Sequence, residues 1–423
     1  TVLVYSDADR DSLPVRMADI AVCIGPGPSA QSYLDIQRII TAAEITDVEA
    51  IHPGYGFLSE NTHFADVCES CQIEFIGPSS EIMKRFGDKS MARELAQKAG
   101  VPVVPGSEGV VDTVEDAIRM SKSIGFPVMV KAAGGGGGRV MRQAHNEVSL
   151  GNAFYAAKSE ADTAFGNSDI YIEKLIENPR HIEIQILADR HGNVLHLGER
   201  DCTIQRRHQK LIEESPSPAI SDSVRENISK AAVALAKNVG YTNAGTFEFL
   251  LDKNDDFYFM EVNTRLQVEH PVTETITGID IVENQLRIAN GEHLGIKQED
   301  VVFNGAAIEC RINAEDTNNG FRPCPGKVEL FYPPSEKEVR LDSHLYSGYV
   351  IPPFYDSLIA KLIVWGKDRD EAISRAHTSL KNFVIQGVHT TIPFTLNILE
   401  HINFQKGKID TSFIESHLLN EEN

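Results

Sequence analysis

Short apolar segments alternate with helical patterns through the first part of the chain. The apolar segments are VLVY at residues 2–5, EAIHPG at 49–54 and IEFIGP at 73–78, and a helical pattern covers residues 33–43. This succession of strands and helices predicts a parallel sheet covered by helices over residues 1–85.

A second unit follows a helical linker. The linker is SMARELAQKAG at residues 90–100, and Pro102 follows it closely. From residue 103 to 173 the order strand, helix, strand, glycine run, helix, strand predicts a small α+β unit. The remainder is rich in strands and then mixes helices with hairpins. We therefore expect domains at residues 1–85, 86–175 and 176–423.

Strict alternation of polar and apolar residues is clear in HIEIQIL at 181–187. His181, Glu183 and Gln185 alternate with apolar residues, mostly isoleucine, which predicts a strand with one apolar face. Its polar face either points to solvent or contributes to a site.

Two further alternating segments, GTFEFLL at 245–251 and FYFMEVN at 257–263, flank a turn-like DKNDD. A loop at 253–256 would place Glu248 directly opposite Glu261, with Asn263 farther along the same face. Opposed like charges destabilise a sheet, and a divalent cation such as Mg²⁺ or Mn²⁺ would remove that cost. The alternatives are a solvent-facing hairpin and a register shifted by one residue.

Polar residues continue at every second position after this hairpin. They are Asn263, Arg265, Gln267 and Glu269, and Pro271 ends the run. An amide, a guanidinium and a carboxylate on one face suit a small oxyanion, which Arg265 would bind with two hydrogen bonds. Glu269 is then placed to act as a general base.

A run of glycine follows Lys131 at the end of an apolar strand. The glycines are Gly134, Gly135, Gly136, Gly137 and Gly138. Bare backbone amides beside a lysine suit phosphate oxygens, although the spacing matches neither a Walker A loop nor a dinucleotide-binding turn. We expect a glycine-rich lid between two strands; a hairpin loop without a ligand is the alternative.

The chain is acidic, with a formal net charge of −21 and a pI of about 5.1. This charge disfavours nucleic acid and anionic membranes as partners, and no apolar run is long enough to span a bilayer. Within it, ERDCTIQRRHQK at 199–210 gathers Gln205, His208 and Lys210. Such donors suit a triphosphate or bicarbonate, unless the run is a solvated loop. Six scattered cysteines fit a reducing compartment.

Together these segments resemble the biotin carboxylases of the ATP-grasp superfamily over essentially the whole chain. The matching stretches are HPGYGFLSEN at 52–61, IGPSSEIMKRFGDK at 76–89, VKAAGGGGGR at 130–139, ENPRHIEIQILAD at 177–189, ERDCTIQRRHQK at 199–210, AGTFEF at 244–249, EVNTRLQVEHPVTE at 261–274 and ECRINAED at 309–316. The resemblance implies a mixed α/β and α+β chain with the ATP-grasp fold. It would have a Rossmann-like N-terminal domain, a small lid domain and a C-terminal domain of strands and helices.

Carried over by position, the resemblance implies a role for each site residue. Bicarbonate would attack the γ-phosphate of ATP, and the resulting carboxyphosphate would release CO₂ to carboxylate biotin. The residues are, for ATP, Lys89, Lys131, Gly134 to Gly138, Glu173, His181, Gln205 and His208; for two Mg²⁺ (or Mn²⁺) ions, Glu248, Glu261 and Asn263; for bicarbonate, Lys210, Arg265, Gln267 and Val268; and for biotin, Tyr55 and Arg340. Glu269 would deprotonate bicarbonate, and Arg340 would stabilise the biotin enolate.

The resemblance also implies partners. The best match is the subunit of bacterial or plastid acetyl-CoA carboxylase that performs the first half-reaction. It would act as a homodimer with a biotin carboxyl carrier protein and carboxyltransferase subunits, in bacterial cytoplasm or plastid stroma. The alternatives are the corresponding part of a propionyl-CoA, methylcrotonyl-CoA or pyruvate carboxylase, and a catalytically impaired scaffold.

Two departures from the family pattern carry expectations of their own. The family begins upstream with a strand and turn reading like IANRGEIA, so we expect the N-terminal domain here to lack one strand–helix unit. Val140 stands where the lid motif continues as GGGGGRGM. A β-branched residue disfavours a positive φ, so we expect a stiffer or displaced lid.

Overall fold

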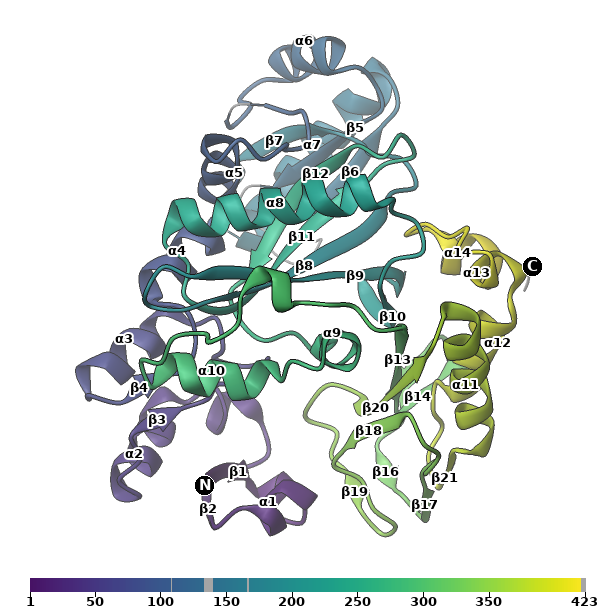
Figure 1. The fold of residues 1–423 in the computed structure, drawn as a ribbon. Helices are drawn as coiled ribbons and strands as arrows, with labels where there is room; N and C mark the ends of the chain where they lie inside the picture. The colour runs from purple at the N-terminus through teal and green to yellow at the C-terminus, as the bar shows by residue number, and fades with distance from the viewer. Residues whose placement is uncertain (108, 133–139, 166, 420–423) are drawn as a thin grey trace.

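The computed structural model describes residues 1–107, 109–132, 140–165 and 167–419. An eight-stranded sheet, antiparallel throughout, runs through it in the order β12-β11-β8-β9-β10-β13-β20-β18 (Figure 1). The strands are β8 Arg180–Ala188, β9 Val194–Arg206, β10 Gln209–Ser215, β11 Asn243–Leu251, β12 Phe257–Asn263, β13 Ala306–Asn313, β18 Val339–Ser343 and β20 Leu358–Gly366. This sheet brings the alternating segments at 181–187, 245–251 and 257–263 into one layer.

The N-terminal part contains two parallel strand pairs. These are β1 Val2–Ser6 with β2 Ile20–Gly25, and β3 Ala50–Ile51 with β4 Glu74–Phe75. Parallel pairing is confirmed, but within the described ranges the two pairs form separate sheets. The helices are α1 Leu13–Met17, α2 Ile36–Ile45, α3 Thr62–Ser70, α4 Ser80–Gly87 and α5 Lys89–Lys98.

Helix α2 begins three residues later than the predicted Tyr33 because Asp35 caps it. The Asp35 side chain accepts a hydrogen bond from the backbone amide of Arg38 and so satisfies one of the amides that a helix start leaves without a partner. Asp88 caps α5 in the same way and fixes the position of Lys89 at its first turn.

A three-stranded antiparallel sheet in the order β6-β5-β7 forms the small second unit. Its elements are α6 Val114–Ile124, β5 Val128–Ala132, β6 Met141–Ala144, α7 Glu147–Phe165 and β7 Ile170–Lys174. The glycine run thus lies between two strands, β5 and β6, as predicted. Residues 133–139, which include Gly134 to Gly138, lie outside the described residues.

Val140 is described, and its φ is 56°. A β-branched residue rarely adopts this left-handed conformation, so the conflict expected from the sequence exists. The side chain is only 6% exposed and belongs to the apolar core of this unit, together with Val128 and Val130. Packing therefore offsets the backbone strain. The effect on lid motion stays a prediction.

The two faces of β8 have different surroundings. Ile182, Ile184 and Ile186 pack in a core that includes α8 Asp222–Val239, which Figure 1 shows running across this end of the sheet. The polar residues of β8 point to the opposite face, yet they are also buried. The solvent-exposed interpretation of that face is therefore wrong, and the buried polar groups require partners.

The C-terminal part covers both faces of β13 and β20. Helices α11 and α12 pack on one face, and α9 packs on the other, where Val272 and Ile276 contact Ala307 and Ile363. The helices are α9 His270–Thr277, α10 Ile281–Ala289, α11 Arg369–Asn382, α12 Ile392–Glu400, α13 Ile402–Gln405 and α14 Phe413–His417. Short ladders join β14 Glu315–Asp316 to β15 Arg322–Pro323, β16 Gly326–Lys327 to β19 Val350–Ile351, and β17 Leu330–Tyr332 to β21 Val384–Gln386.

No helix in the described part of the chain has both the length and the apolar character that crossing a membrane requires.

Replacing Ile184, a fully buried residue of β8 in the core shared with α8, should lower the free energy of unfolding. We expect Ile184→Ala to cost about 2–5 kcal/mol, because the lost side chain leaves a cavity in a closely packed core. Ile45→Ala is the matched control, since Ile45 is 77% exposed, and should cost less than about 0.5 kcal/mol. Urea unfolding of the two variants measures both values, and equal losses would contradict this account of the core.

Candidate active site

The β11–β12 hairpin pairs Glu248 directly with Glu261, as predicted. The predicted loop is nevertheless wrong by one residue, because Leu251 rather than Asp252 pairs with Phe257. A bulge opposite Phe249 and Glu248 adds one residue, Met260, to β12 and restores the expected pairing. Glu248 is only 3% exposed, so the alternative of a solvent-facing hairpin is also excluded.

A large cavity of about 1440 Å³ lies over this face of the sheet and reaches the small second unit. Most of the predicted site residues line it: Tyr55, Lys89, Lys131, Glu173, His181, Gln205, His208, Lys210, Glu248, Glu261, Asn263, Arg265, Gln267 and Val268. Segments far apart in the sequence therefore converge on one space. Glu269 and Arg340 are not among the lining residues.

The opposed carboxylates have different electrostatic surroundings. Burial would raise the pKa of Glu248, but Lys210 and His181 together hold it well below its usual value. His181 Nε2 lies 2.9 Å from Glu248 Oε2, and Lys210 Nζ lies 3.2 Å from Oε1. Burial and the neighbouring Glu248 raise the pKa of Glu261. The pair therefore resists carrying two negative charges, and a cation between them would let both stay ionised.

Strand β12 ends at Asn263, so the predicted alternation up to Glu269 does not continue as strand. The side chains converge nevertheless. Asn263 donates to Glu248 over 2.7 Å, Gln267 donates to the same carboxylate over 3.1 Å, and Arg265 donates to Asn263 over 3.0 Å. Arg265 also pairs with Glu60 at 2.9 Å. A polar loop held by these contacts places the amides and the guanidinium over the carboxylate pair.

Glu269 lies beneath this loop and is completely buried. Its two oxygens accept hydrogen bonds from Lys210 Nζ at 2.5 Å and Arg311 at 2.9 Å. Burial alone would raise the pKa of Glu269, but Lys210, Arg311 and Arg200 hold it well below its usual value. The carboxylate is therefore ionised and in a position to accept a proton, although its bound cations make it a weak base.

The hairpin between β9 and β10 turns through Arg207 and His208, whose φ values are 49° and 66°. Since Arg206 pairs with Gln209, these two residues form a tight turn in which both central residues have positive φ. The turn directs Gln205 and His208 to the cavity, where they line the wall. The interpretation of this basic run as a solvated loop is therefore wrong for Gln205, which is 8% exposed, and for Lys210, whose side chain is 12% exposed. It holds for Arg207 and His208 in the turn itself, which are exposed although they line the cavity.

Lys131 and Glu173 form an ion pair at the other end of the cavity, and Arg93 lies 3.3 Å from the same carboxylate. Residues expected at the phosphates and at the adenine thus contact each other directly. Lys89 lines the cavity from the start of α5.

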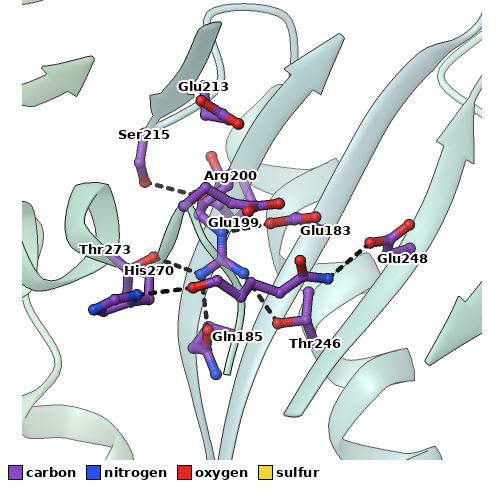
Figure 2. A network of polar contacts seen from close by, with 12 residues as sticks. Glu183, Gln185, Glu199, Arg200, Glu213, Ser215, Thr246, Glu248, His270 and Thr273 are labelled. Atoms are coloured by element: carbon purple, nitrogen blue, oxygen red, sulfur yellow. Dashed lines mark hydrogen bonds and ion pairs between the residues drawn. The ribbon is translucent and has the colours of Figure 1, made fainter. Parts of the chain in front are cut away.

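Arg200 organises the buried polar face below the cavity (Figure 2). Its guanidinium is fully buried and donates to Glu183 at 2.5 Å, Gln185 at 2.8 Å, and Thr246 and Thr273 at 3.0 Å. Glu183 in turn accepts a hydrogen bond from Lys210 at 2.6 Å. The polar residues of β8 are therefore the support on which Lys210 is held.

Arg340 is placed differently from what the resemblance implied. Its guanidinium pairs with Glu274 at 2.7 Å and with Asp342 at 2.8 Å on the edge strand β18. Arg311 of the inner strand β13 lines the cavity instead and contacts Glu269. Tyr55 does line the cavity, and the Lys361 ammonium lies 5.9 Å from its ring centre.

Comparisons with known proteins agree with this geometry. Residues 1–83 match the biotin carboxylase N-terminal domain, 88–297 the ATP-binding domain of the carbamoyl-phosphate synthase L chain, and 309–416 the biotin carboxylase C-terminal domain. The chain belongs to the biotin carboxylase family. Biotin carboxylase 1 of Bacillus subtilis is 54% identical, covering 99% of this chain and 93% of the relative. The chloroplastic biotin carboxylase of Arabidopsis thaliana is 53% identical, covering 98% and 78%.

Solved structures give the same result, so the ATP-grasp fold is confirmed. A biotin carboxylase–β,γ-ATP complex from Campylobacter jejuni is 50% identical with a TM-score of 0.94, covering 98% of this chain and 93% of that one. The biotin carboxylase domain dimer of the Hydrogenobacter thermophilus 2-oxoglutarate carboxylase is 49% identical with a TM-score of 0.92, covering 99% and 92%. That structure contains MgADP, ADP and bicarbonate.

Sequence reasoning missed Arg200, Arg311 and Lys361. Arg311 lies in the alternating ECRINAED segment, where Glu309, Arg311 and Asn313 share one face, and this pattern was a usable signal. Arg200 and Lys361 lie in strands whose pairing decides which face they occupy, and pairing is absent from the local pattern.

Removing the buried guanidinium of Arg200 should destabilise this biotin carboxylase strongly. We expect Arg200→Met to lower the free energy of unfolding by about 3–5 kcal/mol, because Glu183 keeps a buried charge with one partner fewer. Arg190→Met is the control, since Arg190 forms an exposed pair with Glu74, and should cost less than about 1 kcal/mol. Denaturant unfolding tests both, and a small loss for Arg200→Met would contradict the supporting role of the network.

Proposed function

We propose that this chain carboxylates biotin on a carrier protein, using ATP and bicarbonate, with the residues of the cavity in the roles given below. The observation that carries this assignment is the position of Lys210. Its ammonium contacts Glu248 of the carboxylate pair and Glu269, the base, at the same time. Phosphate activation and proton transfer would therefore take place next to each other.

The carboxylate pair suits a divalent cation, because two directly opposed acids supply oxygen ligands and lack balancing charge at Glu261. Glu248, Glu261 and the amide oxygen of Asn263 would hold Mg²⁺ or Mn²⁺, which would neutralise charge on the ATP phosphates. Lys89 and Lys131 would bind the phosphates from the opposite wall. Lys131 would first leave Glu173, which then becomes available to the nucleoside end.

Bicarbonate would bind between Lys210, Arg265, Gln267 and the backbone at Val268. As an anion it competes with Glu269 for Lys210, and losing that hydrogen bond raises the pKa of Glu269. Glu269 would then accept the bicarbonate proton, and the resulting dianion would attack the γ-phosphate, which breaks its bond to the β-phosphate and gives carboxyphosphate and ADP. His181 would keep Glu248 ionised throughout.

Biotin would occupy the cavity wall around Tyr55, and Arg311 would face its ureido oxygen. This replaces the role expected of Arg340, whose guanidinium is bound by two carboxylates away from the lining. Carboxyphosphate decomposes to CO₂ and phosphate, and the phosphate would remove the ureido proton. Arg311 would then stabilise the enolate charge before it captures CO₂.

The wider setting follows from the relatives. We assign the reaction to the first half-reaction of acetyl-CoA carboxylase in fatty acid synthesis, with a biotin carboxyl carrier protein and carboxyltransferase subunits as partners. Bacterial and chloroplastic relatives support bacterial cytoplasm or plastid stroma as the compartment. The solved domain dimer of a relative supports a homodimer.

Replacing the proposed base should abolish coupled turnover. We expect Glu269→Ala to lower biotin-stimulated phosphate release from ATP and bicarbonate by about 100-fold or more, because no other carboxylate of the described residues contacts Lys210 and Arg311 together. Glu299→Ala, at an exposed carboxylate, is the control. Biotin-stimulated release that survives in Glu269→Ala would contradict the assignment, and no release in the folded wild type would favour a scaffold.

The two arginines can be separated in one assay. We expect Arg311→Ala to lower kcat by about 100-fold, because it removes a donor from the developing enolate and a partner from Glu269. Arg340→Ala should keep a much larger share of kcat, since its contacts are with Glu274 and Asp342. Carboxylation of free biotin measures both, and the reverse order would restore the role expected from the sequence.

A further inference from the structure

The eight-stranded sheet contains a second pair of opposed carboxylates, separate from Glu248 and Glu261. Glu213 of β10 is the direct register partner of Glu309 of β13. Both side chains are 0% exposed. The Cβ atoms of directly opposed residues in a sheet lie about 5 Å apart, so the two carboxyl groups project into the same buried region.

The hydrogen bonding of this pair is incomplete. Glu213 Oε1 accepts from Arg311 Nε at 2.6 Å, whereas Glu213 Oε2 and both oxygens of Glu309 have no hydrogen-bond partner among the described residues. Buried carboxylate oxygens without donors are costly, and two such groups facing each other are more so. If one carboxyl carries a proton, it can donate a hydrogen bond to a free oxygen of the other.

Nearby cations do not supply the missing charge, because each is already engaged. Arg311 is shared between Glu213 and Glu269. Lys361 Nζ donates to the Val268 carbonyl at 2.7 Å and lies 3.5 Å from Asp342. The charged and titratable groups around Glu309 are Glu213 from β10, Arg311 from β13, Lys361 from β20, Arg340 and Asp342 from β18, and Glu269, His270 and Glu274 from α9 and the residue before it.

We propose that Glu213 and Glu309 share one proton and, as a singly charged pair, hold the Arg311 guanidinium against Glu269. With one negative charge, the pair balances one edge of Arg311 and leaves the other edge to the base. With two negative charges, the pair would compete with Glu269 for the same guanidinium. Both are therefore positioning residues, and this role deepens the proposed function because it acts through its base.

The electrostatics agree with this geometry. Burial raises the pKa of Glu309 well above its usual value and Glu213 raises it further, although Lys361 and Arg311 act in the opposite direction. Burial also raises the pKa of Glu213 to about 7, against the effect of Arg311. Burial and the like charge of the neighbouring carboxylate therefore both disfavour the doubly ionised pair at neutral pH.

Stability as a function of pH tests the proton directly and needs no catalysis. Above the pKa of an unfolded glutamate, the native state keeps a proton that the unfolded state releases, so the free energy of unfolding falls as pH rises. Glu309→Gln is neutral in both states and loses this dependence. We expect Tm to fall less between about pH 5 and about pH 8 in Glu309→Gln than in wild type, by about 2 °C or more.

Glu299→Gln is the control for the same charge change at an exposed position, and should keep the wild-type pH dependence. A Glu309→Gln variant that keeps the wild-type dependence, or that fails to fold, would overturn the shared proton. Infrared spectra of the wild type provide a second measurement that needs no variant to fold. They should contain a protonated carboxyl band at about pH 8, and its absence would also overturn the proposal.

Kinetics test the positioning role. We expect Glu213→Gln to lower kcat by roughly 100-fold with little change in KM for ATP, because Arg311 loses the anion at Nε and shifts from Glu269. Glu309→Gln, which replaces a neutral carboxyl by a neutral amide, should keep a larger share of kcat. Equal kcat in Glu213→Gln and wild type would overturn this role. A wild type without any turnover would contradict the proposed function alone, since the pH and infrared tests stand without activity.

Discussion

The structure depends on balancing charge inside a sheet that is covered on both faces. Glu183, Glu248 and Glu269 are buried, and the ammonium of Lys210 contacts all three. Isolated buried charges are very costly, so this arrangement persists only because further cations, Arg200 and Arg311, balance the same carboxylates. The other features of the site follow from which of these charges the protein balances itself and which it leaves for substrates to balance.

Protein groups balance the charges beneath the cavity, whereas the charges that face the cavity are balanced only in part. Beneath Glu183, the guanidinium of Arg200 forms hydrogen bonds to strands β8 and β11 and to helix α9, and so links all three elements. At the top, Glu261 forms no ion pair within the described part of the chain, and in the proposed mechanism Lys131 would exchange Glu173 for a phosphate. A nucleotide with its metal ion would thus complete the charge balance that the chain leaves incomplete, and this would favour its binding.

Local patterns predicted the strands well because alternation records burial on each face. They also found the Glu248–Glu261 pair, although the loop and the bulge at Met260 are compensating deviations that no pattern reveals. The resemblance assigned the enolate-stabilising role to Arg340, and local patterns offered no correction, since Arg311 and Arg340 both lie in strands. The difference is sheet order: β13 is an inner strand beside β10, whereas β18 is the edge. The position of each strand in the sheet depends on pairing between strands that are far apart in the sequence. Local sequence patterns do not reveal that pairing.

The low pKa of Glu269 links this charge balance to catalytic order. A base held by two cations is protected from solvent protons, but it is too weak to deprotonate bicarbonate while both cations remain. In the proposed mechanism, the arriving bicarbonate would remove this obstacle itself, because it would bind the same lysine. Arg311 must stay in place during this exchange, or Glu269 would lose both cations at once and a buried carboxylate would be left unbalanced. We therefore propose separate tasks for the two cations: Lys210 would move to the substrate, whereas Arg311 would keep the base in position.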